Sequence, residues 1–457
     1  MNLKNIFVSL ILSLILISCG GGGSIENSTS SNSINSNSDT TINNNESSEV
    51  KTTPNINMET IYRSFNVGFG GSGSFSFSRD NGDNNDPVWL NSTDLILDDN
   101  IENNREYQEI KYFDASNFDI LQQKLKKSKF IVYWITKYWS ESWNNLSTIQ
   151  NAMDAGYIPV FNYWYFADEL LGGLPDENEI QEYYEHNLRI SRFLSKLHGT
   201  KFVIMEPEFN KNTVIDDKSN QDKFISIISN AIDNIKNNTS DVKFSLCMMD
   251  RGSRSVNSDS YENDKCGYEN CALGDKEEWD KLEYIYNSLL SKLDFISFEE
   301  MIAQFNKTVN TPYSNDDIGI EYLDTRVSNF SKYLKDKYNK PIFMPYIAVA
   351  TATWSDENSD GKIDNSELDL SGWEDEADNF YKNLMQKRDE LLENGLFGFA
   401  VMSLFDDPTH DINGYQYYAN NEYHLGIIKS SAQDEVDKYS FGDIEFKRDI
   451  VETIFGD

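Results

Sequence analysis

The feature that most limits the fold of this chain is a repeated switch between short apolar runs and longer amphipathic stretches. Eight runs of six to nine residues, rich in branched and aromatic side chains, have the pattern of buried strands. These runs are 63–68, 130–136, 158–165, 202–208, 243–250, 295–301, 341–349 and 397–405. Between most of them lie helical stretches at about 116–127, 146–155, 177–198, 219–237, 276–292, 319–338 and 372–394. This order predicts an α/β fold with a parallel sheet.

Eight strands with seven intervening helices predict a (β/α)8 barrel, or TIM barrel, that forms one domain with inserted loops over residues 58–457. An open doubly wound sheet is the alternative. No Gly-x-Gly-x-x-Gly sequence follows an early strand, which argues against the dinucleotide-binding form of that alternative. The first strand has the least distinct pattern, and we assign no element to the Gly-, Ser-, Asn- and Asp-rich residues 69–115 that follow it.

The first residues have the pattern of an export signal. A positive start at Met1–Lys4 precedes an apolar stretch, Phe7–Ile17, that is too short for a membrane span of about 20 residues. The segment ends in Leu16-Ile17-Ser18-Cys19, which resembles the lipobox of bacterial lipoproteins. This resemblance implies that residues 1–19 are a signal peptide and that acylated Cys19 anchors the exported chain to the outer membrane or cell surface. The alternative is an ordinary secretory peptide with an incidental cysteine.

Composition indicates a disordered linker after the signal segment and a strongly acidic chain as a whole. Residues 20–57 consist mainly of Gly, Ser, Asn and Thr, which bury too little apolar surface to fold, so we expect a disordered linker. The whole chain carries 75 acidic and 40 basic side chains, a formal net charge of −35. We therefore expect no nucleic-acid partner, because binding phosphates requires a cationic surface.

One twelve-residue segment, 356–367, fits the pattern of a calcium loop at every diagnostic position. Its oxygen ligands would be the side chains of Asp356, Asn358, Asp360, Asp364 and Glu367 and the main-chain carbonyl of Lys362. The segment resembles the loops of EF-hand and dockerin-type proteins, which implies Ca²⁺ as cofactor. Its strand-like flank and the lack of a second loop favour a structural ion over a calcium sensor, and a solvated acidic loop is the alternative.

Acidic and aromatic residues gather where the predicted strands end, which is where the active site of a (β/α)8 barrel forms. In chain order these regions supply Trp134, Trp139, Asn162, Trp164, Glu206, Glu208, Glu299, Glu300, Tyr346, Trp354, Asp406, Asp407 and His410. Cleavage of a glycosidic bond needs one carboxyl that protonates the leaving oxygen and another that attacks or activates water. Aromatic rings suit the C–H faces of sugars, so these residues predict a site for polysaccharide or oligosaccharide.

The dipeptide Glu206-Pro207 at the end of the fourth predicted strand resembles the acid/base segment of (β/α)8 glycoside hydrolases. This resemblance implies Glu206 as the general acid. Glu208 lies close to it in the sequence, and Glu299 is the candidate nucleophile or base, chosen from the strand periodicity given next. The chain departs from the common pattern in two respects. Met205 stands where these enzymes usually carry Asn, and residues 341–354 contain no acid for the usual nucleophile.

Strand periodicity gives the expected directions of these side chains, because successive residues of a strand face opposite sides of the sheet. Ser297 and Glu299 should face the barrel interior, where small polar residues fit, and Glu300 should face the helices. By the same reasoning Glu206 and Glu208 should share one face. The alternative for these acids is a structural role at the rim, such as a salt bridge between Glu299 and Arg251.

Further residues complete the expected substrate site. The rings expected to line sugar subsites are Trp139, Trp164 and Trp354. Asp406 is expected in the same site. Asp406 or Asp407 is the alternative to Glu299 as the second catalytic carboxyl beside Glu206. The leading hypothesis is thus a lipid-anchored, calcium-binding glycoside hydrolase. The alternative is a surface lipoprotein that binds glycan without cleaving it.

The cysteines and two histidines carry less information. Cys266 and Cys271 lie in one polar loop, where a local disulfide is expected outside the cytoplasm. Cys247 falls within a predicted strand and is expected to be a buried thiol. His186 and His198 fall in a helical stretch, and we expect both on the protein surface.

Overall fold

The computed structural model describes twelve segments of the chain. They are residues 53–72, 77–80, 87–90, 115–141, 144–249, 278–302, 323–351, 353–354, 368–369, 373–406, 424–430 and 444–456. The chain divides into two compact units, residues 1–50 and 51–457, and every described residue belongs to the second unit. None of the described helices is long and apolar enough to cross a membrane.

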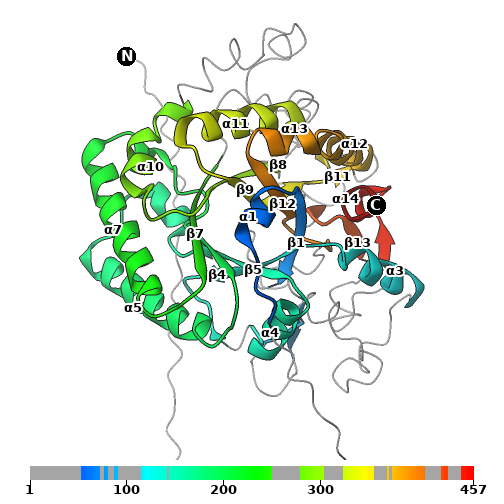
Figure 1. Ribbon diagram of the computed structural model, residues 1–457, viewed down its shortest axis with the longest axis horizontal. Helices are drawn as coiled ribbons and strands as arrows, with labels where there is room; N and C mark the ends of the chain where they lie inside the picture. The colour runs from blue at the N-terminus through cyan, green and yellow to red at the C-terminus, as the bar shows by residue number, and fades with distance from the viewer. Residues whose placement is uncertain are drawn as a thin grey trace, which may run out of the picture. The chain divides into compact units, whose positions relative to one another are not determined.

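Eight parallel strands close into a barrel, which confirms the predicted (β/α)8 fold (Figure 1). The strands are β1 (Asn66–Ser72), β4 (Phe130–Thr136), β5 (Ile158–Trp164), β6 (Lys201–Met205), β7 (Val242–Met249), β8 (Ile296–Ile302), β9 (Ile342–Val349) and β12 (Leu396–Val401). Neighbours in the sheet follow the chain order, and β1 closes the circle by pairing with both β4 and β12. The alternative of an open sheet is therefore wrong.

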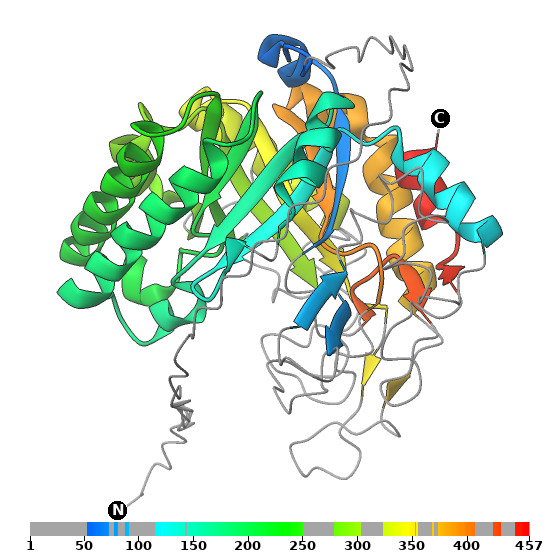
Figure 2. The ribbon, with the colours of Figure 1, turned by 90° about the horizontal axis from the view of Figure 1, so that it is seen from below.

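Amphipathic helices surround the barrel, and α5 and α7 lie side by side on its outside (Figure 2). The longer helices are α3 (Ala115–Leu125), α4 (Leu146–Asp154), α5 (Glu177–Leu194), α7 (Lys218–Lys236), α10 (Glu283–Leu289), α11 (Leu323–Tyr338) and α12 (Trp373–Gln386). Shorter ones are α1 (Met58–Tyr62), η3 (Ala167–Leu171), α6 (Asn212–Ile215), α13 (Arg388–Glu393) and α14 (Ile450–Phe455). Two helices, α12 and α13, replace the single helix predicted over 372–394, because the helical conformation is interrupted at Lys387.

Short strand pairs lie outside the barrel sheet. They are β2 (Phe77–Asp80) with β3 (Pro87–Leu90), β10 (Thr353–Trp354) with β11 (Leu368–Asp369), and β13 (Ile428–Ser430) with β14 (Ile444–Phe446). All three pairs are antiparallel. The first pair falls within the segment after the first barrel strand, to which the sequence pattern assigned no element.

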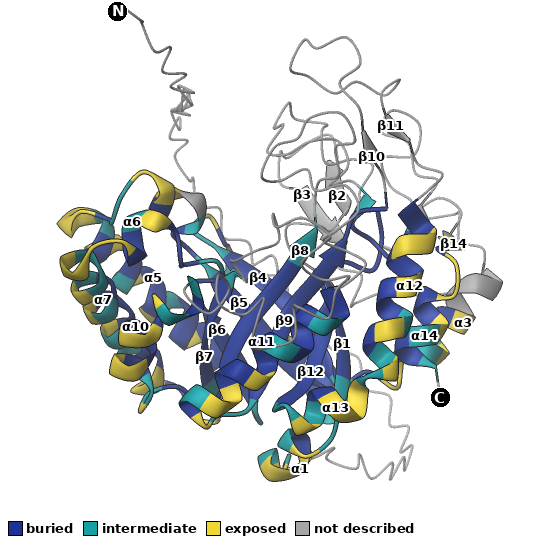
Figure 3. Cartoon of the chain, turned by 90° about the horizontal axis from the view of Figure 1, so that it is seen from above, coloured by how far each residue is buried: buried dark blue, intermediate teal, exposed yellow. Residues whose placement is uncertain are grey.

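The end of the barrel where the strands begin is filled by phenylalanine. Five rings, of Phe130, Phe202, Phe295, Phe343 and Phe397, touch one another with centroid separations of 4.6–6.3 Å. Helix α1 covers this layer with Ile61 and with Tyr62, whose ring lies 5.0 Å from that of Phe397. Figure 3 shows α1 at this end, with the barrel strands buried and the helices exposing their outer faces. Polar chemistry is thus confined to the opposite end.

Two contacts of the first strand with its neighbours require glycine, because the backbones approach too closely for a side chain. A Cβ on Gly68 would lie 2.6 Å from the carbonyl oxygen of Phe130 in β4. On the other side, a Cβ on Gly398 in β12 would lie 2.1 Å from the carbonyl oxygen of Asn66. Glycine weakens the hydrophobic pattern of a strand, which explains why this strand was the least distinct in the sequence.

Candidate active site

Two carboxylates and a tyrosine meet inside the end of the barrel where the strands finish. The hydroxyl of Tyr346, in β9, donates to Oε1 of Glu208 at 2.9 Å. Burial, then Glu208 and Glu299, raise the pKa of Tyr346 well above its usual value. Burial and the same two carboxylates also raise the pKa of the Cys247 thiol in β7. Glu208 and Glu299 therefore face the same space, although they come from different strand ends.

A lysine holds the second oxygen of Glu208. Nζ of Lys211 lies 3.2 Å from Oε2 of Glu208, and the two side chains are only 8% and 14% exposed. Lys211 is positioned at the start of the short helix α6. Tyr346 donates to one oxygen of Glu208 and Lys211 donates to the other, so the orientation of this carboxyl is fixed.

Glu206 lies on the other side of the strand. Its Oε2 accepts a hydrogen bond from the main-chain N–H of Phe166 at 3.0 Å, and its side chain is fully buried near Tyr163 and Tyr183 of the outer core. Burial raises its pKa to about 8, and hydrogen bonding from Phe166 and Tyr183 offsets only part of that shift. A buried carboxyl with this pKa is protonated at neutral pH.

The expectation that Glu206 and Glu208 share a face is wrong. Strand β6 ends at Met205, and the backbone then takes positive φ angles of 37° at Glu206 and 64° at Glu208. The alternation of side chains holds only for extended backbone, so it fails from this point. Positive φ is uncommon for residues other than glycine, and residue type gave no sign of it here.

Strand β8 keeps its alternation. Glu299 lies opposite Met249 of β7, and Glu300 lies opposite Ile347, which belongs to the core between barrel and helices. Glu299 is 4% exposed and fully buried Ser297 precedes it on the same face. These directions match the periodicity of the sequence.

The predicted subsite rings take three different positions. Trp164 packs edge-on against Trp134 with a centroid separation of 5.8 Å, and the ring of Trp134 lies 5.0 Å from that of Tyr346. Both indoles therefore belong to the end of the barrel where the strands finish, which is called the mouth below. Trp354 lies in β10, and its side chain is outside the described part. Trp139 is 1% exposed, donates from Nε1 to Asn144 at 2.7 Å and packs on Phe193 of α5. It is a core residue, which corrects its predicted subsite role.

Asp406 serves a structural ion pair. Its Oδ1 accepts from Nζ of Lys447 at 2.5 Å, and both side chains are buried. Lys447 also donates to Oγ1 of Thr351 at 2.7 Å and to the carbonyl of Gly426 at 2.7 Å. The remaining oxygen, Oδ2, lies 3.4 Å from Nδ1 of His424. These partners place Asp406 in a network that joins the ends of β9 and β12, which argues against its predicted contact with substrate.

Sequence reasoning missed two features of this region. Lys211 carried no signal, because its role depends on the turn after β6. His186 was expected on the surface but is buried, its Nδ1 lying 2.9 Å from the hydroxyl of Tyr163. Burial lowers the pKa of His186 to about 3, so the ring stays neutral.

Several predicted residues lie outside the described part of the chain. They are Cys19, the calcium ligands Asp356, Asn358, Asp360, Lys362, Asp364 and Glu367, the cysteines Cys266 and Cys271, and also Arg251, Asp407 and His410. Within the residues that are described, no three His, Cys, Asp or Glu side chains are grouped to hold a metal ion.

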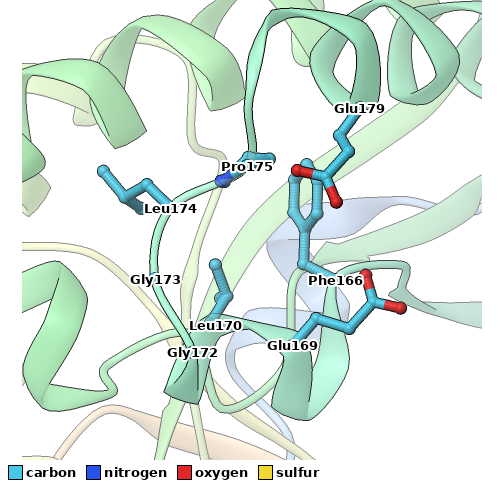
Figure 4. Close-up of a pocket in the computed structure, with 8 residues that line it drawn as sticks. All are labelled: Phe166, Glu169, Leu170, Gly172, Gly173, Leu174, Pro175 and Glu179. Atoms are coloured by element: carbon cyan, nitrogen blue, oxygen red, sulfur yellow. The ribbon is translucent and has the colours of Figure 1, made fainter. Parts of the chain in front are cut away.

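A surface pocket of about 180 Å³ lies between η3 and the start of α5 (Figure 4). It is lined by Phe166, Glu169, Leu170, Gly172, Gly173, Leu174, Pro175 and Glu179. Glu169 forms an ion pair with Lys137 at 2.9 Å, and Glu179 accepts from the N–H of Asp176 as part of the α5 capping box. Because both carboxylates have structural partners, we assign this pocket no catalytic role.

Comparison with known proteins gives only distant structural similarity. No protein-family model matches the sequence, and no curated protein matches it. Among solved structures, a family 1 β-glucosidase from Thermotoga maritima is 11% identical, with 71% of this chain and 84% of that chain covered and a TM-score of 0.40. A monomeric mutant of a hyperthermophilic β-glucosidase is 11% identical, with 86% and 99% covered and a TM-score of 0.47. The closed strand order, and not these similarities, establishes the barrel.

The buried carboxyl of Glu206 predicts a pH-dependent stability. Between its ordinary pKa of 4.5 and the raised value of about 8, the folded state keeps a proton that the unfolded state has lost. Stability should therefore fall as pH rises through this window, by up to about 1.4 kcal/mol per pH unit. Glu206→Gln removes this titration. Melting temperatures measured from pH 5 to 8 should fall more steeply for the wild type than for Glu206→Gln, and parallel curves would contradict the assignment.

Proposed function

We propose that this chain hydrolyses glycosidic bonds with Glu208 and Glu299 as its carboxyl pair. The observation that carries the proposal is that both acids lie at the same end of the barrel. Glu208 is bonded to the hydroxyl of Tyr346 and, through its main-chain N–H, to the carbonyl of Cys247, and Glu299 lies opposite Met249 of the same strand β7. Glycoside hydrolysis requires two carboxyl groups on opposite sides of one bond. The phenylalanine layer closes the other end of the barrel, so a substrate reaches these acids from one side only.

The surroundings of the two acids suggest different roles. Glu208 accepts from Tyr346 and pairs with Lys211, and two donors on one carboxyl orient it as a nucleophile or base requires. Glu299, which is 4% exposed, is the second carboxyl of the site and takes the role of proton donor. These roles differ from those predicted from the sequence, in which Glu206 was the acid and Glu299 the nucleophile or base.

We further propose that residues 356–367 bind a structural calcium ion. The strands that flank this segment, β10 and β11, pair antiparallel through Trp354 with Leu368 and Thr353 with Asp369. The two ends of the segment are therefore held together, as a closed ligand loop requires. Strands in place of the helices of an EF-hand agree with a single rigid site beyond the end of β9.

A lipid anchor at Cys19 is the third part of the proposal. It rests on the lipobox-like sequence and on the polar residues 20–57 that follow it, which would act as a tether between membrane and barrel. This places the proposed active site outside the cytoplasm, where polysaccharides are met.

The catalytic assignment is tested with a panel of polysaccharides and a reducing-end assay. Glu208→Gln and Glu299→Gln should each lower turnover of any cleaved substrate by roughly 100-fold or more, because each loses a carboxyl that acts on the reacting bond. Glu206→Gln is the matched control, and it should keep turnover because its side chain faces α5. Loss of activity in Glu206→Gln alone would overturn the assignment. A wild type that binds glycan but cleaves none would support the non-catalytic alternative.

The calcium site is tested by thermal unfolding. An ion that binds only the folded state adds about 2.7 kcal/mol when present at a hundredfold above its Kd, which shifts the melting temperature by roughly a few degrees. Millimolar calcium should raise the melting temperature, EGTA should lower it, and magnesium should have a smaller effect. Glu367→Gln should shrink the calcium shift. An unchanged melting curve together with no heat of binding would exclude the site.

The anchor is tested by fractionation of the producing cells. Cys19→Ser removes the thiol that would carry the lipid, so the protein should move from the membrane pellet to the soluble fraction. Cys247→Ser is the control, because this thiol is buried in β7 and is out of reach of an acylating enzyme. Membrane association of Cys19→Ser equal to that of the wild type would refute the anchor.

A further inference from the structure

Four side chains leave polar atoms unpaired inside the barrel mouth. The buried atoms without a hydrogen-bond partner are Nε1 of Trp134, Oδ1 and Nδ2 of Asn162, Nε1 of Trp164 and Oγ of Ser297. Asn162 and Ser297 are fully buried, and Trp134 is 4% exposed. Buried polar groups in native proteins nearly always have partners, so such a group of exceptions indicates that a ligand or water meets them.

Trp134, Asn162 and Trp164 come from the neighbouring strands β4 and β5, and Ser297 comes from β8; the strand partners of Asn162 and Ser297 show that both face inward. Asn162 lies opposite Trp134 of β4 and Ile204 of β6, and Ser297 lies opposite Cys247 of β7 and Phe343 of β9. All four of these apolar neighbours belong to the core cluster inside the barrel. The unpaired atoms therefore face the interior of the barrel, where Trp134 touches Tyr346.

We infer that these four side chains bind one uncharged, hydroxyl-bearing sugar unit next to the carboxyl pair. The inference rests on the proposed function, because it places that unit beside Glu208 and Glu299. Asn162 offers both a donor and an acceptor, the two indoles offer donors, and Ser297 can act as either. A sugar hydroxyl both donates and accepts, so a ring with several hydroxyls satisfies the whole set, whereas an apolar ligand satisfies none of it.

Charge selects against an acidic sugar. Among the described residues that meet at the mouth, Glu208 and Glu299 are acidic and Lys211 is the cation that pairs with Glu208. The carboxylate of a uronic acid or a sulfate would thus lie close to a like charge, in a chain whose net charge is −35. Like charges placed together at a binding site lower affinity strongly. The expected substrate class is a neutral glycan.

Asn162 is the residue expected to set this specificity. Asn162→Ala removes a donor and an acceptor together and should weaken binding roughly 10- to 100-fold. Ser297→Ala removes one hydroxyl and should weaken binding less. Both side chains are fully buried, so the melting temperature of each variant is measured beside its affinity; Ser297→Ala removes a single oxygen atom, which keeps its loss of binding separable from loss of folding. The matched control is Asn230→Ala, on the exposed face of α7.

Binding is measured by calorimetry on the full chain carrying Glu299→Gln, which prevents turnover. The neutral probes are hexasaccharides of glucose, mannose, xylose and N-acetylglucosamine, and the acidic probes are oligogalacturonate and oligoalginate of equal length. At least one neutral probe should bind, and both acidic probes should bind at least roughly tenfold more weakly than it. Asn162→Ala should weaken this binding by roughly 10- to 100-fold, and Asn230→Ala should leave it unchanged.

The outcomes separate this inference from the proposed catalysis. A neutral probe that binds through Asn162 but is not cleaved by the chain with Glu299 intact would sink the proposed hydrolase and leave the sugar site standing. Three results would overturn the sugar site itself. These are no binding of any neutral probe, tighter binding of an acidic probe, or binding that is unchanged in both Asn162→Ala and Ser297→Ala.

Discussion

The contact among five phenylalanine rings at one end of the barrel is the interaction on which the rest of the structure depends. Rings from the starts of β4, β6, β9 and β12 and from just before β8 meet on the barrel axis. Burying several aromatic side chains in one layer supplies a large part of the hydrophobic stabilisation of the barrel. Because this layer holds the starts of the strands together, the inward-facing polar residues Trp134, Asn162, Trp164 and Ser297 further along the strands can keep unpaired atoms without loss of the fold.

The division of the barrel into a phenylalanine layer at one end and a polar mouth at the other also explains where the backbone is irregular. The chain leaves the regular strand conformation at Glu206 and Glu208, immediately after β6. This irregularity turns one carboxyl toward α5 and the other toward the barrel axis. Uncommon backbone conformations cost free energy and persist where the surrounding structure supports them, which here is the network of Tyr346, Lys211 and Phe166.

Much of the fold could be predicted from the sequence, because strands and helices have local patterns. The predicted strand 130–136 coincides with β4, and the predicted order of strands is that of the closed barrel. The site could be predicted only in part. Glu299 follows from strand alternation, whereas the reversal at Glu206 depends on a φ angle that residue type does not reveal. Trp139 was misplaced because its partners Asn144 and Phe193 are set by tertiary packing.

The buried Lys447 makes the rim of the barrel depend on the end of the chain. Asp406 follows the last barrel strand, but the ammonium that compensates its charge comes 41 residues later. A buried carboxylate without its partner is strongly unfavourable, so the rim between β9 and β12 depends on a residue beyond the last barrel strand. Lys447 supplies the charge for Asp406 and also binds Thr351 and Gly426. A chain shortened before Lys447 would keep all eight barrel strands but would leave the charge of Asp406 without its ammonium partner.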